Sequence, residues 1–91
     1  MTKVDVYTKP WCHYSGRAIN LLKRRGIAFN EINISTNPDR EVEMKTRSAR
    51  TTVPQVFVGH VHIGGSDELF IADKTGLLQK ILDSDKQAQT A

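Results

Sequence analysis

The stretch KVDVYTKPWCHYSGRAINLLKRRGIAFNEINI, residues 3–34, predicts a strand, a helix and a second strand in succession. Apolar and polar residues alternate over Lys3–Thr8, as is typical of a strand. Residues 15–25 carry four apolar side chains on one broad face, and Gly26 follows as a helix stop signal. Residues 28–34 are predicted to form the second strand. A strand, a crossover helix and a strand make a parallel pair with a right-handed connection, so an α/β fold is expected.

The rest of the chain adds a helix, a hairpin and a last helical region. Asn37 followed by proline predicts the start of a helix over residues 38–49. Acidic residues in its first turns and basic residues near position 47 complement the dipole of this helix. Two short apolar runs, residues 55–58 and 61–63, flank a Gly-His turn and predict a tight hairpin. A further helix is predicted from Ser66, interrupted at Gly76 and followed by a last amphipathic turn or two. We therefore expect a small four-stranded mixed sheet with helices on both faces.

Length and charge limit the range of functions. The 91 residues suffice for one domain, which we assign to residues 1–83, with residues 84–91 as a polar tail expected to fray. The formal net charge of +3 favours small anions or acidic partners but is too weak to imply nucleic acid. No long apolar run marks a signal peptide or membrane span, so we expect a cytoplasmic protein without membrane partners, acting as a monomer.

Cys12 is the only cysteine, and it lies between the first strand and the first helix. Unpaired backbone N–H groups at a helix N-terminus, together with the nearby Lys9, favour the thiolate and lower the pKa of the thiol. A single cysteine excludes a disulfide within the chain, and no metal is expected. His60 and His62 are too few for a metal site and are predicted to be solvated in the hairpin, and residues 23–25 (Lys-Arg-Arg) are predicted to be a solvated helix end.

Three separated segments complete the pattern: Cys12-His13-Tyr14-Ser15, Thr52-Val53-Pro54 and Gly64-Gly65-Ser66-Asp67. Together they resemble the glutaredoxins, the thioredoxin-fold family that uses glutathione, and the resemblance covers the chain from Val4 to about Leu82. The Cys-x-x-Ser tetrad alone is a weak signal, but its combination with the other two segments at these spacings is specific. The resemblance implies a thioredoxin-like fold.

The resemblance also implies an activity. Cys12 would attack the sulfur of a mixed disulfide between a protein and glutathione, and a second glutathione would reduce the glutathionylated enzyme. Glutathione would then be the co-substrate, and glutathionylated proteins would be the partners. A buried, inert cysteine is the alternative interpretation of Cys12.

The same resemblance assigns a glutathione site to the second and third segments. Pro54 would be cis and would present the Val53 backbone to the cysteine of glutathione like a short strand, with Thr52 orienting the loop. Gly65 and Ser66 would offer backbone N–H groups and a hydroxyl to the γ-glutamyl carboxylate, and Asp67 would accept from its ammonium group. An ordinary trans proline and a plain helix cap are the alternatives.

Four further residues are weaker candidates. Lys9 could meet the glycine carboxylate of glutathione as well as the thiolate, and Tyr14 could line the groove beside the sulfur. Arg40 is a candidate second partner for a carboxylate, and Ser15 occupies the second position of the tetrad. Solvation of Lys9 and Arg40, and packing of Tyr14 on its helix, are the alternatives.

The chain departs from many glutaredoxins at two positions. Where they have Cys-Pro-Tyr-Cys, the tetrad ends in Ser15, and Ser66 replaces a cysteine that often follows Gly-Gly. Ser15 is either natural or a cysteine-to-serine replacement in a dithiol member, and only the monothiol route remains. The rival function is carriage of a [2Fe–2S] cluster between two chains, with Cys12 as the protein ligand, as in monothiol glutaredoxins with Cys-Gly-Phe-Ser. His13 and Tyr14 are bulkier than that Gly-Phe pair and leave less room for a cluster.

Overall fold

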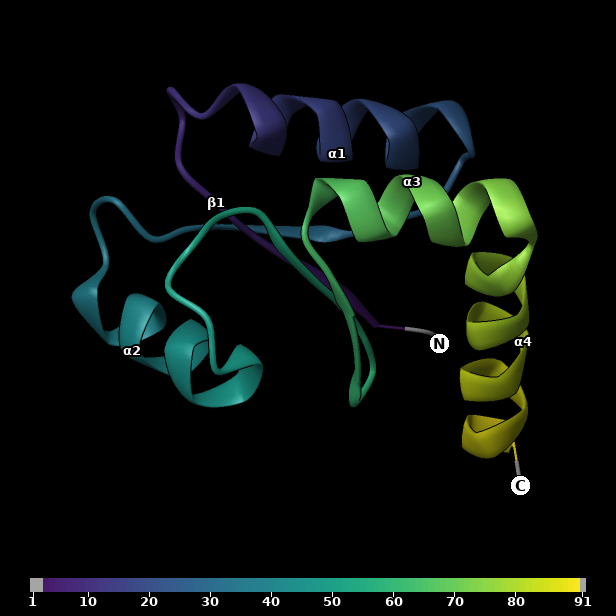
Figure 1. The fold of residues 1–91 in the computed structure, drawn as a ribbon. Coiled ribbons are helices and arrows are strands. Elements are labelled where there is room, and N and C mark those ends of the chain that lie inside the picture. The colour runs from purple at the N-terminus through teal and green to yellow at the C-terminus, as the bar shows by residue number, and fades with distance from the viewer. Residues whose placement is uncertain (1–2, 91) are drawn as a thin grey trace.

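The computed structural model describes residues 3–90, with side chains described as far as Ser84. Strands and helices alternate along the chain before a hairpin and two final helices (Figure 1). In chain order the elements are β1 (Val4–Thr8), α1 (His13–Arg24), β2 (Asn30–Asn33), α2 (Pro38–Ser48), β3 (Gln55–Val58), β4 (Val61–Gly64), α3 (Ser66–Thr75) and α4 (Leu77–Thr90).

The four strands form one mixed sheet in the order β2-β1-β3-β4. β1 pairs with β2 in parallel, and the β1–β3 and β3–β4 pairs are antiparallel. Helices α1 and α3 lie side by side over one face, and α2 covers the other (Figure 1). The predicted thioredoxin-like class, with helices on both faces of a four-stranded mixed sheet, is therefore confirmed.

The two central strands are buried on both faces because their side chains alternate between two cores. Val4 and Val6 of β1 belong to the core under α1, α3 and α4, whereas Tyr7 belongs to the core under α2. On β3, Val56 and Val58 share the first core and Phe57 the second. This packing fixes the carboxyl end of β1, from which the chain enters the segment that carries Cys12.

The largest differences from the predicted boundaries concern three elements. Helix α1 begins at His13, two residues before the predicted start, because Cys12 already has the extended backbone of an N-cap residue. Strand β2 is shorter than the predicted residues 28–34. Helix α4 continues to Thr90 rather than for a turn or two, and its polar end is rich in good helix formers.

Some predictions are not tested by the fold. The assignment of residues 84–91 as a separate polar tail stays a prediction, because the side chains of residues 85–91 lie outside the described part of the molecule. Over the described residues, none of the helices is long and apolar enough to cross a membrane.

Candidate active site

Cys12 occupies the junction between β1 and α1 and caps the N-terminus of the helix. Its backbone N–H donates to the Lys9 carbonyl at 3.1 Å, which closes a turn, and its carbonyl accepts from the Gly16 N–H at 3.2 Å, which starts the helix. The thiol is half-buried. Both backbone bonds hold the sulfur at the end of the helix where peptide N–H groups have no intrahelical acceptor.

The surroundings of the sulfur favour its ionised form. Burial raises the pKa of Cys12. A larger opposite effect comes from the Ser15 hydroxyl, the backbone N–H groups of Ser15 and Tyr14, and the charge of Lys9, which all lower this pKa. The net result is a pKa below the ordinary value of a thiol. The lowered pKa agrees with the prediction from the sequence and is the condition for a reactive thiol, and the role of Cys12 as nucleophile stays a prediction.

Ser15 contributes to this effect in a specific way. Its side chain is buried, and its hydroxyl makes no hydrogen bond to a described residue. A Cys12 thiolate would give this hydroxyl an acceptor, which is the physical reason that Ser15 lowers the pKa of Cys12.

The Val53–Pro54 loop lies next to the sulfur. The Cys12 thiol points at the Val53 carbonyl oxygen at 3.7 Å, although the two residues are far apart in the sequence. The Val53–Pro54 peptide bond is cis, which confirms the prediction for Pro54. The first two segments of the pattern therefore meet at Cys12.

The loop is held from behind by two residues that the sequence did not identify. The amide nitrogen of the buried Gln55 donates to the carbonyl and hydroxyl oxygens of Thr52 at 3.1 and 3.2 Å. Its amide oxygen pairs with His62 Nε2 at 2.7 Å, so the imidazole N–H is the donor. The prediction of a solvated His62 was wrong, because its ring stacks on Phe57 with centroids 4.7 Å apart.

The third segment lies against the same loop. Gly65 caps the N-terminus of α3, and a side chain at this position would come within 3.4 Å of the Pro54 carbonyl oxygen. Gly64 has a φ of 123°, which favours glycine, and a side chain there would collide with Glu68. The structure therefore brings Cys12, the Val53–Pro54 loop and the start of α3 together at one site.

Glu68 organises the N-terminus of α3. Its carboxylate accepts from the Gly65 N–H at 3.0 Å and pairs with Arg50. The Gly65 N–H first, and then Arg50, hold the pKa of Glu68 below its usual value. The backbone N–H groups of Ser66 and Asp67 belong to the first turn of α3, where N–H groups have no intrahelical acceptor, so they can meet an anion.

The other predicted residues differ in how close they lie to this site. Lys9 is half-buried and acts electrostatically on Cys12, and Asp67 is exposed in the first turn of α3. Tyr14 is 53% exposed on the first turn of α1. Arg40 forms an ion pair with Glu43 of its own helix at 3.3 Å, and the described contacts do not link it to the sulfur.

A metal site of the chain's own is not indicated. Within residues 3–84, no three histidine, cysteine, aspartate or glutamate side chains gather closely enough to hold a metal ion. Cys12 is the single thiol that the chain could offer.

A helix-capping cysteine with a lowered pKa on a thioredoxin-like fold defines the class: a thiol–disulfide oxidoreductase. The glutaredoxin family model matches residues 4–63. The chain belongs to the glutaredoxin family.

Individual relatives agree with this assignment. Glutaredoxin 3 of Escherichia coli K12 is 45% identical over 82 residues, which cover 90% of this chain and 99% of the relative. The solution structure of a Brucella melitensis glutaredoxin is similar with a TM-score of 0.78 and 46% identity, covering 90% of this chain and 89% of the other. A buckwheat glutaredoxin solved as a complex with glutathione gives a TM-score of 0.81 at 26% identity, and the match covers 93% of this chain and 80% of the other.

Proposed function

We propose that this protein reduces mixed disulfides between proteins and glutathione by a monothiol mechanism through Cys12, with glutathione as co-substrate. The observation that carries the proposal is the single thiol of the chain, ionised more readily than usual and lying 3.7 Å from the Val53 carbonyl. The similarity to a buckwheat glutaredoxin that binds glutathione supports the choice of co-substrate.

The reaction takes two exchange steps. The Cys12 thiolate attacks the glutathione sulfur of the mixed disulfide, a new bond forms between these sulfurs, and the protein sulfur leaves as a thiolate that takes a proton from water. The thiolate of a second glutathione then attacks the glutathione sulfur held on Cys12. Oxidised glutathione leaves and the Cys12 thiolate is restored. Each turnover therefore consumes one reduced glutathione, and the other half of the oxidised glutathione comes from the mixed disulfide.

The chain lacks the groups for a dithiol route. Ser15 stands where a second cysteine would close a disulfide, and a hydroxyl oxygen cannot replace the sulfur. The Ser15 hydroxyl instead stabilises the thiolate that is released in the second step. A low pKa in the leaving thiol also speeds that step.

The groups around the sulfur suit glutathione in shape and charge. The Val53 N–H and C=O can pair with the cysteine residue of glutathione, in the loop formed by Thr52 and Pro54. The start of α3 at Gly65 and Ser66 can hold the γ-glutamyl carboxylate. Two charged side chains and one ring complete the site in this proposal: Asp67 for the ammonium group, Lys9 for the glycine carboxylate, and Tyr14 along the wall.

The setting follows from the reaction. A single thiol per chain completes the cycle, so a monomer suffices. The second step consumes reduced glutathione, so the proposed compartment is the reducing cytoplasm.

The test is turnover on a glutathionylated peptide with reduced glutathione, glutathione reductase and NADPH, for the parent and for Cys12→Ser. Parent turnover that falls to the uncatalysed rate in Cys12→Ser would establish Cys12 as the nucleophile. Catalysis that persists in this variant would refute the mechanism. A parent that fails to turn over would favour the alternative, a [2Fe–2S] carrier, which needs a second chain because one chain supplies a single thiolate. Visible absorbance after anaerobic reconstitution with glutathione would then identify the cluster.

A further inference from the structure

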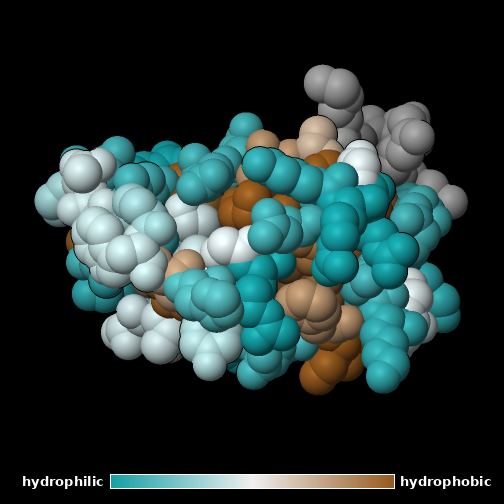
Figure 2. Space-filling view, turned by 90° about the horizontal axis from the view of Figure 1, so that it is seen from above, coloured by the Kyte–Doolittle hydropathy of each residue, from teal (hydrophilic) through white to brown (hydrophobic). Residues whose placement is uncertain are grey.

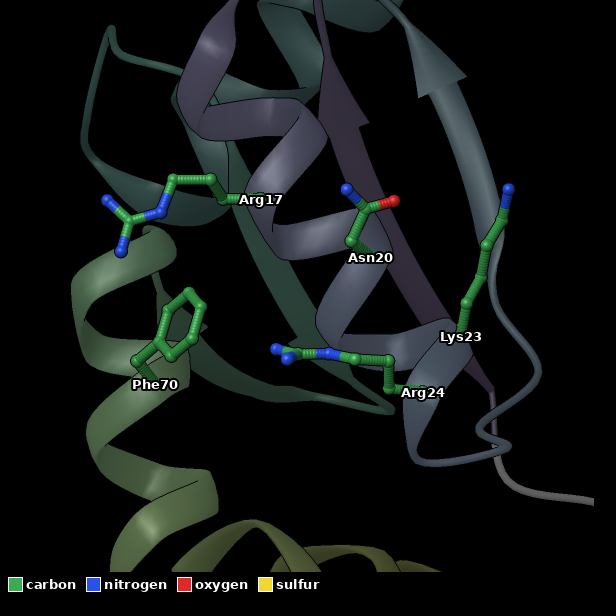
Figure 3. Close-up of a pocket in the computed structure, with 5 residues that line it drawn as sticks. All are labelled: Arg17, Asn20, Lys23, Arg24 and Phe70. Carbon is green, nitrogen blue, oxygen red and sulfur yellow. The ribbon is translucent and has the colours of Figure 1, made fainter.

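An open cleft of about 550 Å³ lies between α1 and α3. Its lining is formed by Arg17, Asn20, Lys23 and Arg24 of α1 and by Phe70 of α3. Figure 3 shows Arg17 and Arg24 reaching toward the side of Phe70, whereas Asn20 and Lys23 lie farther from this ring. The cleft is therefore basic on its α1 wall and aromatic on its α3 wall.

The basic side chains of this cleft are available to a partner. Helix α1 contains no acidic residue from His13 to Arg24. Within the described part of the molecule, carboxylates pair with neither Arg17 nor Arg24, and both side chains are exposed. The next residue differs, because Arg25 is held by Asp73 at 2.8 Å.

The cleft begins beside the active site. The Arg17 guanidinium lies 4.9 Å from the centre of the Phe70 ring and 6.0 Å from that of Tyr14. Tyr14 follows Cys12 by two residues, and Phe70 lies one helical turn beyond Ser66. Arg17 therefore connects the surroundings of Tyr14 with the cleft, so a chain segment that leaves the sulfur of Cys12 past Tyr14 has a short path to this cleft.

This face has the character of a polar docking surface. Figure 2 views the molecule from the side of α1 and α3 and shows hydrophilic side chains over much of the face, with hydrophobic residues between them. Single exposed ion pairs contribute little, because water and salt screen them. A small anion would gain little here, whereas a chain with several carboxylates can meet both guanidinium groups at once.

We propose that the α1–α3 cleft docks an acidic polypeptide segment that flanks the glutathionylated cysteine of a substrate protein, through Arg17 and Arg24. The inference rests on the proposed function, since the occupant is the part of the substrate that leaves from the mixed disulfide. A polypeptide is favoured over nucleic acid because the group that Cys12 attacks is carried by a polypeptide.

Docking in this cleft raises the local concentration of one kind of substrate without changing the exchange chemistry. The groups that favour the thiolate are Ser15, Tyr14 and Lys9, and neither Arg17 nor Arg24 is among them. Removing the two guanidinium groups should therefore affect kcat/KM for acidic substrates and leave the reaction with small disulfides unchanged.

The experiment compares three substrates: a glutathionylated peptide flanked by aspartate and glutamate, the same peptide with asparagine and glutamine, and the mixed disulfide of cysteine and glutathione. The test variant is Arg17→Gln/Arg24→Gln. The matched control is Lys45→Gln/Lys80→Gln, which changes the net charge equally at exposed positions on α2 and α4. Arg24→Gln alone preserves the contact between Arg17 and Phe70, so it separates docking from any loss of folding.

We expect the parent to prefer the acidic peptide, and the double variant to lose about tenfold in kcat/KM on that peptide alone, since two exposed ion pairs are removed. Arg24→Gln should lose about threefold, the control should match the parent, and 1 M salt should abolish the preference. Equal loss on both peptides, or equal loss in the control, would overturn the proposal. If the parent turned over the two peptides at equal rates, the proposal would also be overturned. Inhibition by a single-stranded oligonucleotide that depends on Arg17 and Arg24, together with such equal rates, would point to nucleic acid as the occupant instead. Failure on the small mixed disulfide would instead refute the proposed function.

Discussion

Replacing Ser15 by alanine tests how the site prepares its nucleophile. The Ser15 hydroxyl is buried, has no hydrogen-bond partner in the described structure, and lowers the pKa of Cys12. Hydrogen bonds to charged groups contribute about 1.5–3 kcal/mol, and competition by water at a half-exposed sulfur reduces this to about 1 kcal/mol. We therefore expect Ser15→Ala to raise the pKa of Cys12 and to lower the thiolate population about fivefold at a pH below that pKa.

The rate consequences differ at low and high pH. Nucleophilicity of a thiolate falls as its pKa falls, with a Brønsted slope of about 0.4–0.5. Below the pKa, the fivefold smaller thiolate population is partly offset by a more reactive thiolate, so exchange should slow about 2.5-fold. Well above the pKa, both proteins are fully ionised and the variant should react about twice as fast. The two curves of rate against pH should therefore cross.

The assay is stopped-flow reaction of Cys12 with a chromogenic aromatic disulfide across the pH range, with ultraviolet absorbance reporting the thiolate directly. Ser84→Ala is the matched control, because Ser84 is exposed on α4. At a pH below the pKa of Cys12, the free energy of unfolding should not fall in Ser15→Ala, since the lost hydroxyl has no hydrogen-bond partner among the described residues. Superimposable curves for parent and variant would show that the hydroxyl does not act on the sulfur.

Two further predictions concern ligand recognition and folding. Asp67→Asn should lower kcat/KM for the mixed disulfide of cysteine and glutathione about threefold to fivefold, by removing the partner of the ammonium group, while the rate with a chromogenic aromatic disulfide stays constant. Equal losses in both assays would remove Asp67 from glutathione recognition. Burial, and then the charge of Arg50, lower the pKa of His62, so the unfolded chain binds a proton that the folded protein excludes. The free energy of unfolding, from urea titrations, should fall as the pH drops below about 6.5, and this slope should be smaller in His62→Gln but unchanged in His60→Gln. If the unfolding free energy of His62→Gln depended on pH as steeply as that of the parent, the pH dependence would have to come from other groups.

The fold could be predicted from the sequence because its elements leave clear periodic signals. The apolar faces of residues 3–34 and the turn at Gly59-His60 specified the parallel pair and the hairpin, and both are present. The end of α4 could not be placed in this way, because its last residues lack an apolar face and their helix propensity alone extends it.

The site was only partly predictable for a different reason. The three segments were found through their spacing, and the cis bond at Pro54 followed from the resemblance to a family. The Gln55–His62 support of the loop depends on the register between β3 and β4, which shifts between Val56 and Phe57. A one-residue irregularity of this kind reverses which side chains face inward, and a single sequence does not reveal it.

In the proposed mechanism, the chemistry of the sulfur is separate from the choice of protein substrate. The groups that ionise Cys12 come from the turn before it and the first helical turn after it, so they act over short distances and are insensitive to the far end of α1. The proposed docking groups lie further along the same helix, where exposure makes each ion pair weak. Weak contacts suit an enzyme whose protein product must leave after every first step, since a tightly held leaving thiolate would reattack the mixed disulfide on Cys12. Selectivity from α1 should therefore appear as a modest, salt-dependent change in kcat/KM, with the pH dependence of Cys12 unaltered.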